Sequence, residues 1–390
     1  MSKTYCPYPF NGVSLQPNNM VLPCGQYMDS APFQKIIPIN EVRNSEYMKD
    51  MRFRMSNDQH GIGCQCPAEE EAGIVSMRQK SIEKFGIDYS DSLKIVEIFF
   101  DNVCNLKCRS CGSNNSHLWF EEEKELYGVT LSPTKYQKNT LYKDLDLSKL
   151  EMVDLYGGEP MMSIDVENFL TKLCENNVIK NIELSMSTNC TVIPKDNVLK
   201  ALLSARSLKL ALSIDAYGEL NNVIRSGSDF NEIINVMKFF RNLVWQRPKG
   251  TTTILVHSAV SVYNVNLLPE LDDFVISNFP EFSSSTQVVQ FPLFLSIKNT
   301  PEEFKNNVKQ LLTHDRYSNI VKYMEQDGDD LFGHFINFHN KVNEIRQETL
   351  SDKNQLLSDT ISNYKQIPAV EESKIFFKKI INDMKTNMLV

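Results

Sequence analysis

The sequence predicts an α/β fold: a partial (βα)6 TIM-like barrel with a small cysteine-containing N-terminal segment and a helical C-terminal region. Three observations support this prediction. Strand-like apolar runs alternate with helical patterns through the middle of the chain. Polar and glycine-rich motifs directly follow these runs, at the strand ends where parallel α/β folds bind their ligands. The flanking regions differ in composition, with proline and cysteine before the alternating region and polar helical patterns after it.

The alternating region provides the strands of the barrel and the helices between them. Strand-like runs lie at residues 93–100, 151–156, 181–187, 207–214, 252–262 and 286–297. One intervening helix has Ser163 as its N-cap and an apolar face of Ile164, Phe169, Leu170 and Leu173. Another begins near Asp229, with Phe230, Ile233, Ile234, Met237 and Val244 facing inward. Repeated β-then-α units favour a parallel sheet with right-handed crossovers, and six units give an incomplete barrel.

Length and composition favour an enzyme in the cytoplasm. The 390 residues suggest a large domain with additions, which we divide at residues 1–90, 91–300 and 301–390. A net charge of −8 without a long basic run disfavours nucleic acid as a partner. There is no membrane-spanning apolar stretch and no hydrophobic signal-peptide region at the N-terminus. Without export signals, the nine cysteines are expected to be metal ligands and core thiols rather than disulfides.

The most informative motif is a loop of three cysteines directly after the first strand-like run. Cys104, Cys108 and Cys111 have the spacing C-x3-C-x2-C, which allows one loop to bind one iron–sulfur cluster. Electron-transfer clusters take four protein thiolates. Three ligands leave one iron with an open position, which a catalytic metal site requires. A zinc site with a fourth ligand elsewhere and simple buried thiols are the alternatives.

A second motif, Gly157-Gly158-Glu159-Pro160, follows the next strand-like run. The glycines let the backbone come close to a bound molecule, and the carboxylate of Glu159 can accept a hydrogen bond from an ammonium group. Alone this motif also fits an ordinary turn. Together with the cysteine loop it indicates a ligand site at the strand ends.

This pair of motifs resembles the radical SAM superfamily. The resemblance implies that Cys104, Cys108 and Cys111 hold a [4Fe-4S] cluster whose free iron is chelated by S-adenosylmethionine (SAM). It also implies that Gly157, Gly158 and Glu159 contact the methionine part of SAM.

Further positions match the superfamily in chain order. The resemblance assigns Ser187 and Asn189 to the region that often binds ribose, Ser213 and Asp215 to the end of the following strand, and Arg225 to the arginine that faces the SAM carboxylate. The chain departs from the pattern at Ser110, where the superfamily usually has an aromatic or large apolar residue before the third cysteine. This departure weakens the expected packing against adenine but leaves the cluster loop intact.

The first 90 residues contain four more cysteines in two separated groups, namely Cys6, Cys24, Cys64 and Cys66. Two short strand-like pieces flank Asn18-Asn19 and predict a β-hairpin that ends near Cys24. Four thiols in this arrangement make a closed four-ligand site reasonable. Structural zinc and unrelated free thiols are the alternatives, because composition does not separate zinc from iron–sulfur.

The hairpin with its Pro-Cys ending resembles the auxiliary-cluster segment of SPASM and twitch proteins, which accompany radical SAM cores. In most of those proteins the segment follows the barrel, whereas here it precedes it. The resemblance implies that Cys6, Cys24, Cys64 and Cys66 hold one auxiliary iron–sulfur cluster, and we favour this hypothesis over zinc.

The resemblance also implies a reaction. A radical SAM oxidoreductase or maturase cleaves SAM reductively at its [4Fe-4S] cluster, and the resulting 5′-deoxyadenosyl radical abstracts hydrogen from a substrate. A peptide is the leading hypothesis for that substrate, with a small molecule as the other option. The reducing partner would be a flavodoxin or ferredoxin. The alternatives are a non-catalytic zinc-binding structural protein and a radical SAM enzyme that modifies RNA.

The remaining candidate residues are predicted to be structural. Cys174 and Cys190 are expected to be packed thiols. His334 and His339 are five residues apart and do not have the i, i+4 spacing of a helical metal pair. The acidic run at residues 121–125 is expected to be a solvated helix face.

Overall fold

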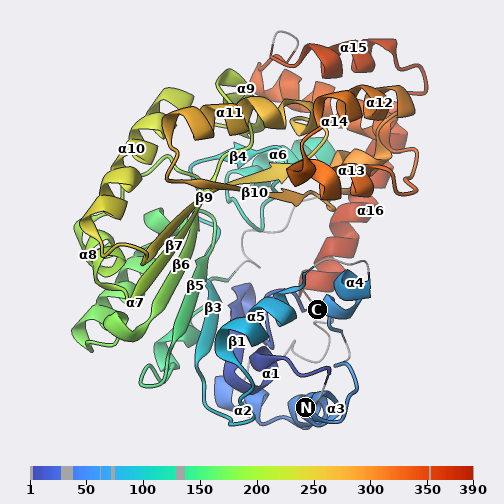
Figure 1. The fold of residues 1–390 in the computed structure, drawn as a ribbon. Helices are drawn as coiled ribbons and strands as arrows, with labels where there is room; N and C mark the ends of the chain where they lie inside the picture. The colour runs from blue at the N-terminus through green and yellow to red at the C-terminus, as the bar shows by residue number, and fades with distance from the viewer. Residues whose placement is uncertain are drawn as a thin grey trace.

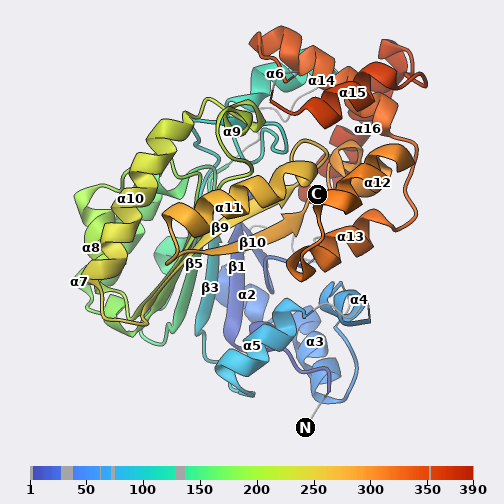
Figure 2. The same ribbon diagram turned by 45° about the horizontal axis from the view of Figure 1, so that its top comes forward.

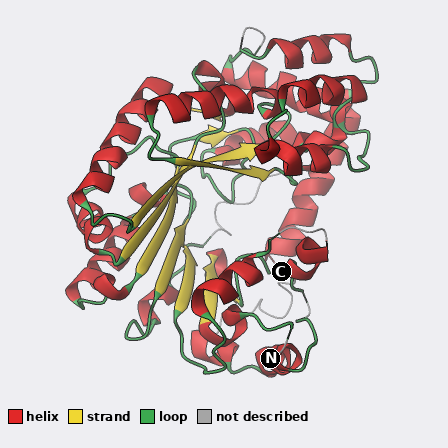
Figure 3. Ribbon diagram, viewed as in Figure 1, coloured by secondary structure: helices red, strands yellow, loops and turns green. Residues whose placement is uncertain are grey.

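The computed structural model describes residues 3–27, 38–61, 63–71, 75–128, 137–350 and 353–389. Its centre is a curved sheet in the order β10-β9-β7-β6-β5-β3-β1-β2, which Figure 1 and Figure 3 show with helices along its outer side. All neighbouring strands are parallel except β1 and β2. The strands are β1 (Gly12–Gln16), β2 (Met20–Leu22), β3 (Ile95–Phe99), β5 (Met152–Tyr156), β6 (Glu183–Thr188), β7 (Ser207–Ser213), β9 (Thr252–Val260) and β10 (Ser283–Val288). A separate two-stranded sheet pairs β4 (Lys107–Cys108) with β8 (Arg225–Ser226).

The six parallel strands from β3 to β10 form the predicted partial barrel. Its helices are α6 (Trp119–Tyr127), α7 (Ile164–Glu175), α8 (Asp196–Ser204), α9 (Glu219–Ile224), α10 (Phe230–Gln246) and α11 (Leu268–Asn278). The prediction for the last strand is wrong in its bounds, because β10 ends at Val288 and the apolar residues after it form short 3-10 turns. Pro292 interrupts this apolar run, and a proline has no N–H to donate to a strand ladder.

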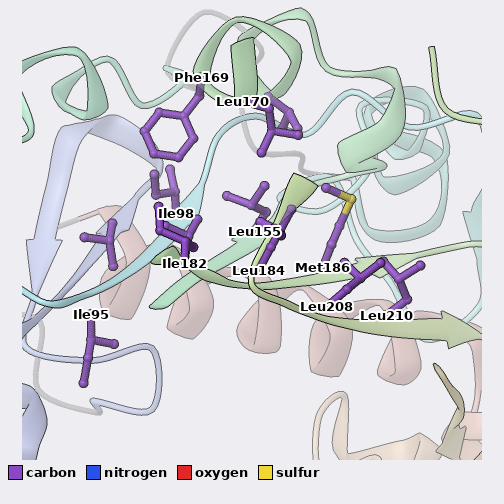
Figure 4. Packing of buried hydrophobic residues seen from close by; sticks show 14 of the residues in the cluster. Ile95, Ile98, Leu155, Phe169, Leu170, Ile182, Leu184, Met186, Leu208 and Leu210 are labelled. Atoms are coloured by element: carbon purple, nitrogen blue, oxygen red, sulfur yellow. The ribbon is translucent and has the colours of Figure 1, made fainter. Parts of the chain in front are cut away.

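The helices that cover the barrel are capped and packed largely as predicted. The Ser163 side chain accepts a hydrogen bond from the Val166 N–H at the start of α7, and Asp229 accepts from the Asn231 N–H at the start of α10. Figure 4 shows Phe169 and Leu170 of α7 packed over the apolar side chains of the strands. The prediction for Ile164 is wrong, since its side chain is 53% exposed at the first position of α7.

The N-terminal hairpin extends the barrel sheet by two strands. β1 pairs with β2 through Asn18 and Asn19, whose φ angles of 61° and 56° are left-handed and suit asparagine. β1 also pairs in parallel with β3, so this region shares one hydrophobic core with the barrel. The helices α1 (Pro7–Asn11), α2 (Ile39–Arg43), α3 (Glu46–Ser56), α4 (Cys66–Glu71) and α5 (Met77–Phe85) gather at this end of the sheet, as Figure 1 shows; Figure 2 shows α2 to α5 from a second side.

The C-terminal region is helical, as predicted. It consists of α12 (Glu302–Leu311), α13 (Ser318–Met324), α14 (Phe332–Arg346), α15 (Gln355–Asn363) and α16 (Val370–Leu389). These helices enclose a second hydrophobic core with α6, α9 and the end of β9, in which Phe294, Phe335 and Phe338 are buried. Among the described residues, no helix combines the length and the apolar character needed to cross a membrane.

Candidate functional site

A cavity of about 550 Å³ opens at the C-terminal ends of the barrel strands. The predicted site residues that line it are Cys104, Cys108, Cys111, Gly157, Gly158, Ser187, Asn189, Ser213 and Arg225. Glu159 and Asp215 do not line it, and both side chains are buried behind its wall. The structure therefore gathers residues from five separate sequence segments around one space, as the strand-end argument predicts.

The cysteine loop is held in place from several sides. Cys108 pairs with Arg225 in the short sheet of β4 and β8. The Trp119 indole N–H donates to the carbonyl of Cys108 over 3.2 Å, and the Ser116 hydroxyl donates to the carbonyl of Leu106 over 2.7 Å. Because these contacts fix the backbone, the three thiols are presented to the cavity by a defined loop.

The donor set of the loop suits a thiolate-bound cluster. Cys104, Cys108 and Cys111 are all free thiols, and Cys104 and Cys108 are buried. The Cys111 S–H group donates to the Cys108 sulfur, which lowers the pKa of Cys108, and the nearby Arg225 charge lowers it further. Burial raises the pKa of Cys104 to about 11, and the hydrogen bond shared with Cys108 raises the pKa of Cys111. Soft sulfur donors are the ligands that iron–sulfur clusters use. Within the described residues, no three His, Cys, Asp or Glu side chains are arranged to hold a single metal ion.

The glycine pair packs directly against the cysteine loop. The Gly158 N–H donates to the carbonyl of Asp101 over 2.8 Å, and the Glu159 N–H donates to the carbonyl of Val103 over 2.7 Å. A Cβ added to Gly158 would lie 2.3 Å from the carbonyl oxygen of Val103, a distance that real Cβ atoms do not tolerate. The glycine is thus required for the close contact between the two motifs.

The Glu159 carboxylate points into the protein and organises the end of β6. One oxygen accepts hydrogen bonds from the Thr188 hydroxyl over 2.9 Å and the Met161 N–H over 3.0 Å, while the other accepts from the Asn189 N–H over 2.6 Å. Burial raises the pKa of Glu159, and these three hydrogen bonds oppose that shift. The side chain of Asn189 in turn lies 3.8 Å from the Cys104 sulfur, so Glu159 acts on the site through Asn189.

Arg225 brings a buried positive charge to the cavity, and Asp215 holds it. Arg225 Nη2 donates to Asp215 Oδ1 over 3.1 Å; Nε lies 2.8 Å from Oδ2 without hydrogen-bond alignment. Asp215 Oδ1 also accepts from the Ala259 N–H over 2.8 Å. The other guanidinium nitrogen, Nη1, lies 3.7 Å from the Cys108 sulfur. Arg225 thus faces both the cavity and the cysteine loop.

The four N-terminal cysteines converge on a second, smaller cavity. Cys6, Cys24, Cys64 and Cys66 all line it, together with His60 and Arg78. Burial raises the pKa of Cys6 to about 12 and that of Cys64 to about 11. The four thiols thus line one cavity, although 60 positions separate the first from the last in the chain.

Comparison with known proteins decides the family. The pattern of the Radical SAM superfamily matches residues 61–260, just over half of the chain. The chain belongs to the Radical SAM superfamily. Membership of this radical SAM protein in the superfamily indicates an enzyme that uses a [4Fe-4S] cluster and SAM for radical chemistry.

Individual relatives are distant. A GTP 3′,8-cyclase of Aquifex aeolicus (strain VF5) is 25% identical over 186 residues, which are 40% of this chain and 55% of that protein. The structure of Streptococcus suis SuiB bound to SAM aligns with 17% identity and a TM-score of 0.35, covering 57% of this chain and 44% of SuiB. That of anSMEcpe bound to SAM aligns with 17% identity and a TM-score of 0.39, covering 59% of this chain and 63% of anSMEcpe. The radical SAM protein described here thus spans less than two thirds of each of these relatives.

Several cavity residues were not predicted from the sequence. Glu97 of β3 lines the cavity, and its carboxylate accepts from the Gly25 N–H over 2.5 Å. Burial, reinforced by the neighbouring Asp154, raises the pKa of Glu97 to about 7. The sequence feature that could have identified Glu97 is its position as the single acidic residue in an otherwise apolar strand. Gln26 and Met77, from the N-terminal region, line both this cavity and the one formed by the four N-terminal cysteines.

The acidic run at residues 121–125 corrects another prediction. Glu121, Lys124 and Glu125 are exposed as predicted, but Glu122 and Glu123 are only 7% and 2% exposed, so the prediction is wrong for these two residues. Glu122 pairs with Lys107 and Arg346, while Glu123 accepts hydrogen bonds from the backbone and side chain of Ser113. Both acids therefore anchor the cysteine loop and the residues after it.

The predictions for the other candidate residues hold in the structure. Cys190 is fully buried, and Cys174 is half-buried against the main core. His334 bonds to the Ser373 hydroxyl, whereas His339 contacts Tyr263 and Asn343, so the two histidines have separate surroundings.

Proposed function

We propose that this chain is a radical SAM oxidoreductase or maturase that cleaves SAM reductively and abstracts hydrogen from a substrate in the same cavity. The observation that supports this most strongly is the convergence of Cys104, Cys108 and Cys111 with the strand-end residues around one space of about 550 Å³. When bound and reduced, the cluster would supply the electron that cleaves SAM to methionine and a 5′-deoxyadenosyl radical.

The chain's own residues would bind and orient SAM. In this proposal Gly157 and Gly158 offer backbone groups to the methionine part, and Arg225 offers its charge to the carboxylate. Ser187, Asn189 and Ser213 provide polar groups along the strand ends, which suit the ribose. Glu159 acts through Asn189 and Asp215 acts through Arg225, because neither carboxylate lines the cavity.

We further propose that Cys6, Cys24, Cys64 and Cys66 hold an auxiliary iron–sulfur cluster. Their convergence on one cavity supports a four-ligand site, and its contact with the main cavity through Gln26 and Met77 favours a role next to the substrate. Four thiolates also suit structural zinc. Iron and acid-labile sulfide beyond one cluster per chain after anaerobic reconstitution would support iron–sulfur, whereas one zinc per chain would support the alternative.

The substrate and the reducing partner complete the proposal. The cavity is also lined by Gln16, Gly25 and Gln26, which are not assigned to SAM and are available to contact a second molecule. We propose a peptide as that substrate, with a small molecule as the other option, and a flavodoxin or ferredoxin as the electron donor. We also divide the chain into an auxiliary segment at residues 1–90, a radical SAM core at 91–300 and a helical region at 301–390.

One experiment tests the proposed function without knowledge of the substrate. Anaerobically reconstituted, chemically reduced protein is incubated with SAM, and 5′-deoxyadenosine is measured by chromatography. The parent protein and the matched control Cys174→Ala should both form it, because Cys174 does not line the cavity. Cys108→Ala should form none. Persistence of the product in Cys108→Ala would refute the assignment of the cluster ligand.

A further inference from the structure

The C-terminal end of α14 reaches the cysteine loop from the far end of the sequence. Figure 1 and Figure 2 both place α14 beside α6, which follows that loop. At its end, Arg346 and Glu348 flank Gln347, whose left-handed φ of 53° turns the chain and ends the helix. We call Arg346 and Glu348 the α14 clamp.

Arg346 holds the loop at Lys107. Its guanidinium donates to the carbonyl of Lys107 over 2.7 Å and to Glu122 over 2.6 Å. The same group lies over the ring of Trp119 at 4.7 Å, and only 2% of the Arg346 side chain is exposed. Trp119 also donates to the carbonyl of Cys108, so Arg346 stabilises both the strand β4 and the indole that supports it.

Glu348 holds the loop at Arg109. Arg109 Nη2 lies 2.7 Å from Glu348 Oε2, and the Arg109 side chain is completely buried. Arg109 lies between Cys108 and Cys111 in the chain, and its Nε donates to the carbonyl of Val223 over 2.9 Å. The other oxygen of Glu348 accepts a hydrogen bond from the hydroxyl of Ser226, which pairs with Lys107 in the short sheet.

The clamp therefore secures both strands of the short sheet on which Cys108 and Arg225 lie. It also balances charge, because Glu348 is the carboxylate that pairs with Arg109 inside the protein. The reduction potential of an iron–sulfur cluster depends on the net charge and hydrogen bonds around it. Removing a negative charge from beside a buried guanidinium makes the surroundings more positive, which favours the reduced cluster.

We propose that Arg346 and Glu348 are positioning residues for the cluster loop: they fix Lys107–Arg109, and thereby Cys108, and set the charge around the bound cluster. This inference rests on the proposed function, since it needs a cluster at Cys104, Cys108 and Cys111. It makes the helical C-terminal region part of the machinery for SAM cleavage rather than a module added for substrate alone.

The test compares Glu348→Gln with Glu344→Gln in the reconstituted full-length protein. Glu344 lies on the same helix, is 70% exposed and pairs only with Lys341 among the ion pairs of the described residues. The midpoint potential is followed by EPR, and the signal that changes on adding SAM identifies the cluster with the open iron. A chelator assay measures how fast iron is lost from that cluster.

Glu348→Gln should shift the midpoint potential to a more positive value and speed up iron loss, whereas Glu344→Gln should change neither. Ser226→Ala keeps the Glu348 charge and removes one hydrogen bond, so it should speed up iron loss without shifting the potential. If Glu348→Gln does not fold, the positioning role is tested with Ser226→Ala and Arg346→Lys, both of which should lose iron faster than Glu344→Gln in the chelator assay. Iron loss equal to that of Glu344→Gln in these variants would overturn the inference. A parent protein that binds no cluster would overturn the proposed function and this inference with it.

Discussion

Replacing Gly158 by alanine should separate the glycine motif from the cysteine loop. The added Cβ would lie 2.3 Å from the carbonyl oxygen of Val103 and 2.7 Å from the carbonyl carbon of Asn102. Both are backbone atoms, so no flexible side chain can move aside. The two hydrogen bonds that join the motifs, from Gly158 to Asp101 and from Glu159 to Val103, are 2.8 and 2.7 Å long.

The expected loss in the free energy of unfolding follows from these contacts. Overpacking by one methyl group costs about 1–3 kcal/mol, and each of the two hydrogen bonds contributes about 1 kcal/mol. Gly158→Ala should therefore lower the free energy of unfolding by about 3–5 kcal/mol if both hydrogen bonds are lost. It should also displace the loop that carries Cys104, and so reduce the iron retained after reconstitution.

The assay is thermal or urea unfolding of the parent and the variant, with iron and sulfide measured on the same samples. Gly250→Ala is the matched control. Gly250 has a positive φ of 82° with nothing within 4 Å of its added Cβ, so its replacement should cost only about 1 kcal/mol and leave iron content unchanged. Equal stability and equal iron content in Gly158→Ala and Gly250→Ala would refute the packing argument.

Three further predictions concern other parts of the site. Because burial raises the pKa of Glu97 from 4.5 to about 7, the folded protein keeps a proton that the unfolded chain releases, and stability falls as pH rises between these values. Glu97→Gln should therefore gain stability over the parent between pH 5 and pH 8, by on the order of 3 kcal/mol in unfolding experiments, and a pH-independent difference would contradict this. Cys64→Ala should lower the iron content by up to one cluster per chain and still form 5′-deoxyadenosine. An unchanged iron content would refute the auxiliary cluster. Glu122→Gln should destabilise the fold by about 1–3 kcal/mol in urea unfolding, because Arg346 loses its buried charged partner, while Glu121→Gln at the exposed neighbouring position should have no effect.

The sequence was sufficient for the barrel because its inner strands are apolar and end in recognisable motifs. The last strand is different. Ser283–Val288 is polar along most of its length, so periodicity does not identify it, while the apolar run that follows contains Pro292 and forms turns. Hydrophobic pattern alone therefore placed this strand a few residues too late.

The sequence predicted most of the residues that gather around the main cavity, but not the direction of each side chain. Glu159 was expected to face a ligand, yet its carboxylate bonds to groups at the end of the neighbouring strand β6. Glu122 was expected to be solvated. Its burial depends on its partner Arg346, which is 224 positions away in the chain and so cannot be recognised from local sequence. Glu97 meets Gly25 only because β1 pairs with β3. Each of these contacts arises from tertiary packing between distant segments, which local patterns do not encode.

The proposed function requires that an open iron held by Cys104, Cys108 and Cys111 binds SAM directly. Electron–nuclear double resonance on the reduced, reconstituted protein with SAM labelled by 15N at its amino group tests this most directly. We expect a coupling between the labelled nitrogen and the cluster in the parent and no such coupling in Cys108→Ala. A reduced cluster in the parent that shows no coupling to bound, labelled SAM would contradict it.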